Sequence, residues 1–189
     1  MKIVAHNGPA PIQPKLAFKH AIVQFTPVTS TLPQIQGMDL NQHLTVVYLD
    51  SGDDTGERTA PLMEQINMQP RQSPCSPDII DTKTGPLLIL KINDSWFTKF
   101  AQWMVGTLKK FNIQASPGIG DMHISLAHGT NDQLTQIWQQ NYLDKHTSVT
   151  LEGPHVSSPS GQIIARKTSS ALMDSDEWLE LALLTRGKF

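Results

Sequence analysis

The chain has 189 residues, of which 17% are charged, and its 15 Lys and Arg against 17 Asp and Glu give a formal net charge of −2. A balance this close to neutral excludes the global basic field that attracts duplex DNA or an anionic membrane. The single Cys75 excludes a disulfide framework, and the longest apolar run is far shorter than the ~20 residues that span a bilayer. The first eight residues lack the apolar core of a signal peptide, so we expect a cytoplasmic protein.

The first half of the chain alternates between strand and turn signals. Residues 20–25 and 44–49 are rich in β-branched and aromatic side chains and predict two strands. Thr59, followed by Pro61, predicts the start of a short helix. The prolines between residues 70 and 86 predict a long irregular loop.

The second half holds the strongest helix signal. From Asp94 or Ser95 to Phe111, aromatic and aliphatic residues recur at helical spacing, which predicts a helix that packs against the core. Asn131 or Asp132 opens a second amphipathic helix that ends near Tyr142. Further strands are predicted at residues 87–92, 122–127, 149–151, 162–165 and 179–184, of which the last segment also suits a helix.

Strands that alternate with helices, and a hairpin turn near residues 159–161, predict an α+β fold. Residues 1–17 are rich in Pro and Ala and predict an N-terminal arm, whereas residues 18–189 are expected to form a single domain.

Two of the predicted strands share a four-residue pattern. His43-Leu44-Thr45-Val46 and His123-Ile124-Ser125-Leu126 each read histidine, apolar residue, hydroxyl residue, apolar residue. Because side chains alternate along a strand, the histidine and the hydroxyl share one face while the apolar residues enter the core. If the two strands are neighbours, the four polar side chains line one cleft.

Three other histidines, His128, His146 and His155, also precede a hydroxyl residue by two positions. They lack one or both of the flanking apolar residues, so we do not assign them to the site. Strand alternation also places His128 and Tyr48 on the faces opposite to the motif histidines.

The paired pattern resembles the 2H phosphoesterase superfamily, which is defined by two His-apolar-Ser/Thr-apolar motifs on strands, commonly about 80 residues apart. Here His43 and His123 are 80 residues apart, and the order of elements is similar over most of residues 18–167. The resemblance implies a bilobal, pseudo-symmetric α+β fold, with two antiparallel sheets facing a central cleft and helices outside.

The four polar residues suit phosphodiester cleavage, which needs a base for the attacking oxygen and an acid for the leaving oxygen. Two histidines can divide these roles near neutral pH, and Thr45 and Ser125 can donate hydrogen bonds to the non-bridging oxygens. The catalytic residues are therefore expected to be His43, Thr45, His123 and Ser125, with no metal or other cofactor, since the sequence holds no metal-binding motif. Which histidine is the base stays open.

Residues outside the motifs are expected to bind the substrate. Arg166 and Lys167 are candidates for contact with a phosphate, and Glu177 and Trp178 are candidates for reaching the cleft, where the indole can stack on a base. Lys91 is a weaker candidate for a phosphate contact, because lysines on strands mostly extend into solvent.

The expected substrate is a nucleotide or short oligonucleotide, and the oligomeric state stays open. Relatives in the resembled superfamily act on 2′,3′-cyclic phosphates, on 2′–5′ linkages or on the cyclic oligonucleotides of bacterial antiviral signalling. The compact length favours a phage-type or bacterial enzyme, acting in the host cytoplasm if viral. Two alternatives remain: a nucleotide-binding or RNA-binding module without turnover, and a metallohydrolase built from His43, His123, His128 and His146.

Overall fold

The computed structural model describes residues 19–35, 42–66, 68–118 and 120–164. The strands are β1 (Ile22–Pro27), β2 (Leu44–Leu49), β3 (Arg71–Thr82), β4 (Gly85–Ile92), β5 (Ala115–Pro117), β6 (His123–His128) and β7 (Ser148–Ser157). The helices are α1 (Ala60–Gln65), α2 (Ser95–Lys110) and α3 (Asn131–Gln140), with short 3-10 helices η1 (Thr29–Thr31) and η2 (Leu143–Lys145). The predicted α+β class is confirmed.

The strands form one seven-stranded antiparallel sheet in the order β1-β7-β3-β4-β6-β2-β5, and β1 also pairs with β2. Six of the strands therefore close into a ring of hydrogen-bonded neighbours, and β5 extends β2 beyond it. The resemblance had implied two separate sheets. Here they are joined because β3 pairs first with β7 and then with β4, and because β2 pairs with both β1 and β6.

The strand β3 lies where the sequence predicts a loop, and that prediction is wrong. Its 12 residues pair with β7 through Pro74 and with β4 from Cys75 onward. A proline disturbs a ladder only where its missing N–H is needed, and Pro74 stands at the change of partner. Beyond Cys75, β3 pairs on one side only among the described strands, so a proline such as Pro77 at an outward position loses no bond.

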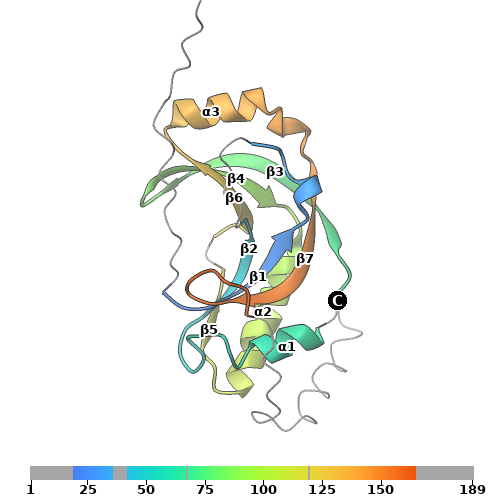
Figure 1. Cartoon of the computed structure of the whole chain (residues 1–189), viewed down its shortest axis with the longest axis vertical. Coiled ribbons are helices and arrows are strands. Elements are labelled where there is room, and N and C mark those ends of the chain that lie inside the picture. The colour runs from blue at the N-terminus through green and yellow to red at the C-terminus, as the bar shows by residue number, and fades with distance from the viewer. Residues whose placement is uncertain (1–18, 36–41, 67, 119, 165–189) are drawn as a thin grey trace, which may run out of the picture.

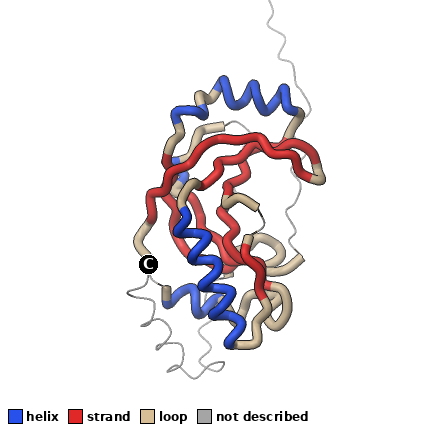
Figure 2. Tube along the Cα trace, turned by 180° about the vertical axis from the view of Figure 1, so that it is seen from behind, coloured by secondary structure: helices blue, strands red, loops and turns tan. Residues whose placement is uncertain are grey.

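Helix α2 covers one face of the sheet, whereas α3 and α1 lie toward its two ends in Figure 1. In Figure 1, α2 lies behind the strands, and in Figure 2 it crosses in front of them. Its buried side chains, which include Phe97, Phe100 and Met104, join Phe25 of β1 in the hydrophobic core, and the ring centroids of Phe25 and Phe97 are 5.0 Å apart. The other face of the sheet, turned toward the viewer in Figure 1, is free of these helices.

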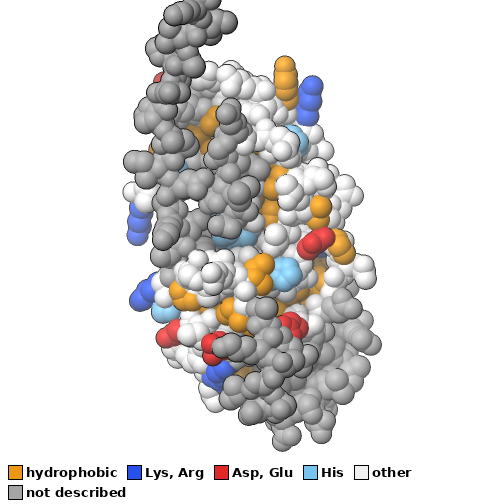
Figure 3. All heavy atoms as spheres, in the orientation of Figure 1, with side chains coloured by type: hydrophobic (Ala, Val, Ile, Leu, Met, Phe, Trp, Pro, Cys, Tyr) orange, Lys and Arg blue, Asp and Glu red, His pale blue; other side chains and the backbone are white. Residues whose placement is uncertain are grey.

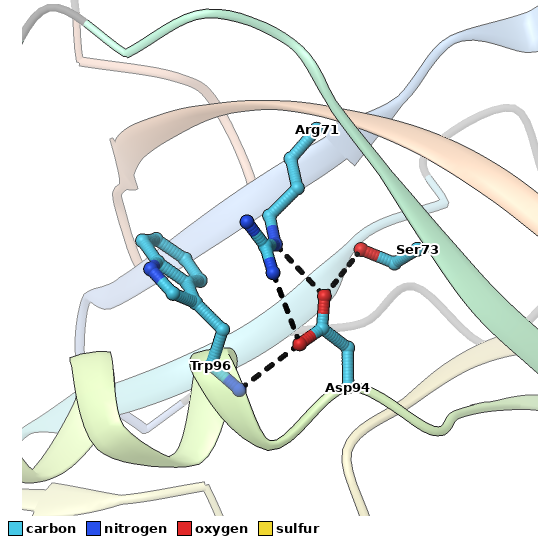
Figure 4. A network of polar contacts seen from close by, with 4 residues as sticks. All are labelled: Arg71, Ser73, Asp94 and Trp96. Atoms are coloured by element: carbon cyan, nitrogen blue, oxygen red, sulfur yellow. Dashed lines mark hydrogen bonds and ion pairs between the residues drawn. The ribbon is translucent and has the colours of Figure 1, made fainter. Parts of the chain in front are cut away.

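A network of polar contacts fixes the start of α2 on β3 (Figure 4). Asp94 is the N-cap and accepts a hydrogen bond from the Trp96 N–H at 3.1 Å. Arg71 donates to both carboxylate oxygens of Asp94, at 2.8 and 3.2 Å, and the buried Ser73 hydroxyl donates at 3.0 Å. The Arg71 guanidinium also lies 5.0 Å from the Trp96 ring. The strand and the helix are thus joined by charge-assisted hydrogen bonds.

Most of the remaining predicted elements are present. The predicted strands at 20–25, 44–49, 87–92, 122–127 and 149–151 correspond to β1, β2, β4, β6 and β7, and the turn near residues 159–161 is closed by a bond from the Ser158 N–H to the Gln162 carbonyl. The strand expected at 162–165 is reduced to a single bridge between Ser157 and Ile163. The expected arm at 1–17 and strand at 179–184 lie outside the described residues. Within the part that is described, no helix is long and apolar enough to cross a membrane.

Candidate active site

The two motif strands lie side by side. β2 and β6 are antiparallel neighbours, and the residue pair that joins them is Leu44 with Ile124, the second position of each motif. Both side chains are fully buried in the core. Continuing the antiparallel register by one residue on either side of this pair places His43 beside Ser125 and Thr45 beside His123.

The four polar motif side chains therefore share one face. They flank two side chains that enter the core, so alternation turns them to the opposite face, the one that the helices leave uncovered. All four are half-buried. Each histidine is a direct neighbour of the other motif's hydroxyl and a diagonal neighbour of the other histidine, which places both imidazoles within reach of one small group.

A backbone contact sets the orientation of one imidazole. His123 Nδ1 lies 2.7 Å from the carbonyl oxygen of Asp121. A carbonyl only accepts, so Nδ1 carries the proton in this contact, and the lone pair of the neutral ring is on Nε2. The ring therefore offers Nε2 for proton transfer, and the hydrogen bond from Nδ1 to the Asp121 carbonyl fixes its tautomer.

Both motif strands carry a β-bulge at the last residue of the motif. On β2, Thr45 pairs with Gln24 and Val47 with Val23, so Val46 is the extra residue. Val46 and Val47 both face the core, and the next residue, Tyr48, returns to the motif face beside Ile22.

The same irregularity occurs on β6. Ser125 pairs with Ile89 and Ala127 with Leu88, so Leu126 is the extra residue and His128 shares the motif face with Leu87. The prediction that Tyr48 and His128 point away from the motif histidines is wrong, because each bulge reverses the alternation. Burial raises the pKa of the Tyr48 hydroxyl above its ordinary value of 10.0.

The sheet register brings further polar residues to the motif face. Gln24 is the β1 partner of Thr45, and His155 is the β7 partner of Gln24. On the other side, Lys91 of β4 is the partner of His123. Gln24 was not among the predicted residues and His155 was set aside, because strand order and register leave no signal in a single sequence.

Space-filling Figure 3 looks onto this face in the orientation of Figure 1. Among the atoms visible there, some histidine side chains lie near the middle and others toward the margins, where the Lys and Arg side chains also lie. A groove of about 450 Å³ runs between α1 and β7 and is lined by His155, by the carboxylates Glu64 and Glu152, and by apolar side chains such as Met63 and Met68. The described residues that line this groove include two carboxylates and His155 but no Lys or Arg.

The loop before the second motif touches the first. The Gly118 N–H donates to the Val46 carbonyl at 2.8 Å, and a Cβ added at Gly118 would lie 2.9 Å from the Thr45 carbonyl oxygen. Glycine is needed here because the loop backbone approaches the backbone of the motif strand closely. This N–H is already bonded within the protein.

The predicted substrate-binding residues Arg166, Lys167, Glu177 and Trp178 lie outside the described residues. Within the described ranges, no group of three or more His, Cys, Asp or Glu side chains is arranged to hold a metal ion.

Comparisons with known proteins identify no relative: no protein-family model matches this chain, and neither a curated protein nor a solved structure matches it significantly. The assignment below therefore depends on the residues and their geometry.

Proposed function

We propose that this chain is a phosphodiesterase of the 2H type that needs no metal and hydrolyses a nucleotide phosphodiester, with His43 and His123 as general acid and base. The observation that carries the proposal is the antiparallel pair of Leu44 and Ile124, which puts the two motifs on one face. In this proposal the bilobal 2H arrangement is expected, with each lobe supplying one motif to a shared cleft.

The reaction divides between the two imidazoles. One Nε2 accepts the proton of the attacking oxygen, from water or a ribose hydroxyl, as that oxygen bonds to phosphorus. The other histidine, protonated as an imidazolium, gives its proton to the leaving oxygen as the bond between that oxygen and phosphorus breaks. Thr45 and Ser125 donate hydrogen bonds to the non-bridging oxygens, whose charge is redistributed in the transition state.

The position of each hydroxyl supports this division. Since Thr45 is beside His123 and Ser125 is beside His43 in the register, a phosphate placed over the Leu44–Ile124 pair meets one hydroxyl and one imidazole on either side. The His123–Asp121 contact supports a ring oriented for proton transfer through Nε2.

The proposed substrate is a cyclic oligonucleotide signal, a 2′,3′-cyclic phosphate or a 2′–5′ linkage. The formal net charge of −2 favours a small nucleotide over long RNA or duplex DNA. A phage-type enzyme that degrades an antiviral signalling nucleotide in the cytoplasm fits this proposal, and the buried free thiol of Cys75 suits a reducing compartment.

The test is a cleavage panel in the presence of EDTA, with 2′,3′-cyclic mononucleotides, 2′–5′ and 3′–5′ oligonucleotides, and cyclic di- and trinucleotides. Wild type is compared with His43→Ala and His123→Ala, and with His146→Ala as a histidine control outside the motif strands. We expect cleavage by wild type and the control, and a loss of at least about 10²-fold in each motif variant. Nucleotide binding without cleavage by wild type would instead establish the binding module, and activity that EDTA abolishes would establish a metallohydrolase.

A further inference from the structure

Lys91 stands beside the proposed catalytic group on the motif face. It is the Cα partner of His123, and its neighbours along β4, Leu90 and Ile92, both enter the core. Alternation therefore turns Lys91 to the same face as His123. Its side chain is 36% exposed, so the ammonium is accessible to a ligand in solution.

The position of Lys91 breaks the local symmetry of the site. The motif strands β2 and β6 are equivalent to each other on the two sides of the Leu44–Ile124 pair. Their outer neighbours, β1 next to β2 and β4 next to β6, are equivalent in the same way. The residue that corresponds to Lys91 is Thr26, which the register places beside His43. Strands β1, β2, β4, β6 and β7 contain a single Lys or Arg between them, which is Lys91. The two sides of the site therefore differ by one cation.

Asp121 holds this cation in place. The Lys91 ammonium lies 2.6 Å from a carboxylate oxygen of Asp121. The backbone carbonyl of the same residue accepts the hydrogen bond from His123 Nδ1. The Asp121 side chain is 64% exposed, and exposed ion pairs of this kind contribute little to stability. An arriving phosphate can therefore replace the carboxylate as the partner of Lys91 at small cost.

The location of Lys91 relative to the motifs defines what it binds. The scissile phosphate in the proposed reaction lies between β2 and β6, whereas Lys91 is one strand farther out, a spacing of about 4.8 Å. The backbone of Lys91 is thus on the outer side of His123, and its ammonium is held there by Asp121.

We infer that Lys91 forms an anion subsite for a second phosphate of the substrate, next to the scissile phosphate on the His123 side. The substrate class that follows is a linear or cyclic oligonucleotide with at least two phosphates, in preference to a 2′,3′-cyclic mononucleotide. This inference deepens the proposed phosphodiesterase function and rests on it for the position of the scissile phosphate.

The probes are 2′–5′ and 3′–5′ adenylyl-adenosine, each with a phosphate at the 5′ end, at the 3′ end or at neither end. Affinities are measured by calorimetric titration in the His43→Ala background, so that the probe is not consumed, and KM and kcat are measured in the wild-type background. Both backgrounds are combined with Lys91→Met, with Asp121→Asn, and with Lys99→Met, which removes the same charge from the exposed side of α2.

We expect one phosphorylated form to bind about tenfold more tightly than the form without terminal phosphate. Lys91→Met should remove this preference and leave the affinity for the unphosphorylated probe unchanged, whereas Lys99→Met should keep it. Asp121→Asn should keep or strengthen it, because it frees the ammonium. A preference that is lost in Lys91→Met but kept or strengthened in Asp121→Asn also excludes a simple loss of folding as the cause.

Two outcomes overturn the inference: no preference for a terminal phosphate in the parent protein, or a preference that survives Lys91→Met. Failure of the phosphodiesterase proposal looks different, since wild type then cleaves none of the probes while the effect of Lys91→Met on binding persists. Cleavage that depends on both histidines but not on Lys91 contradicts the subsite alone.

Discussion

Gln42 donates a hydrogen bond from Nε2 to the carbonyl oxygen of Ser125, 3.2 Å away. The donor directly precedes the first motif and the acceptor belongs to the second. Its side chain is only 8% exposed, so the bond is shielded from water. Because a single residue pair joins β2 to β6, this side chain supplies a second link between the two halves of the site.

Replacing Gln42 with Met should preserve the volume and remove this link. We expect a loss of about 1 kcal/mol in the free energy of unfolding and a fall of about tenfold in kcat, because the two histidines are less well positioned. Urea unfolding and steady-state kinetics measure the two effects. The control is Gln72→Met, which removes an exposed bond to Ser148 and should change neither quantity. An unchanged kcat in Gln42→Met would contradict a positioning role.

The motif hydroxyls should act mainly on the transition state. Thr45→Val and Ser125→Ala are each expected to lower kcat by about 10²-fold with a small change in KM, since the lost hydrogen bonds strengthen as charge moves on the non-bridging oxygens. Steady-state kinetics on the preferred substrate, with melting temperatures as a folding control, test this expectation. A rise in KM at constant kcat would assign the hydroxyls to ground-state binding only.

The Asp94 network should make stability depend on acid pH. Burial raises the pKa of the Asp94 carboxyl, but its hydrogen bonds and the charge of Arg71 outweigh that effect, and the pKa lies below its ordinary value of 3.8. A carboxyl whose pKa is lower in the folded state stabilises the protein above the unfolded pKa, and this contribution is lost as the pH falls through the folded value.

We therefore expect Asp94→Asn to cost about 2 kcal/mol at pH 7 and progressively less below pH 4, as wild type loses the same contribution. Urea unfolding as a function of pH measures both. Asp144→Asn is the control, since this carboxylate accepts one exposed bond from Trp138, and it should change stability by less than about 0.5 kcal/mol. A difference between wild type and Asp94→Asn that does not vary with pH would contradict the explanation.

Two glycines should respond to alanine in opposite directions. A Cβ at Gly118 would lie 2.9 Å from the Thr45 carbonyl, so Gly118→Ala should displace the motif strand and lower both stability and kcat. Gly106 lies within α2 with no atom within 4 Å of the added Cβ, so Gly106→Ala should raise stability by about 1 kcal/mol and leave kcat unchanged. Thermal unfolding and kinetics of both variants test the pair, and a tolerated Gly118→Ala would show that the loop can move away.

The motif strands could be predicted because their signals are local. β-branched residues define Leu44–Leu49, and the repeated pattern of histidine and hydroxyl identifies two polar faces without knowledge of the partner strands. The long helix α2 could be predicted equally well, since its aromatic side chains recur at helical spacing and Asp94 is a suitable N-cap. What these signals could not supply is the register that makes Leu44 and Ile124 partners.

The bulges and the strand β3 show where local reasoning fails. An extra residue at Val46 or Leu126 reverses the face of the sheet to which the following side chains point. The sequence shows only two consecutive apolar residues at each place. Pro74 and Pro77 suggest a break in structure, but their cost depends on whether a neighbouring strand needs the missing N–H. Both features are decided by pairing partners far away in the chain.

The closed order of the strands also bears on how the site is assembled. The first motif lies before the β3–β4 hairpin and the second lies after it, and β1 from the first half pairs with β7 from the second. No continuous fragment of one half can hold both histidines, and the interleaved strands prevent either half from completing its own sheet. Contacts between residues so distant in sequence form late and are lost cooperatively. Catalytic activity of the proposed site is consequently a property of the entire folded chain. This activity should be lost at the same denaturant concentration at which the sheet unfolds.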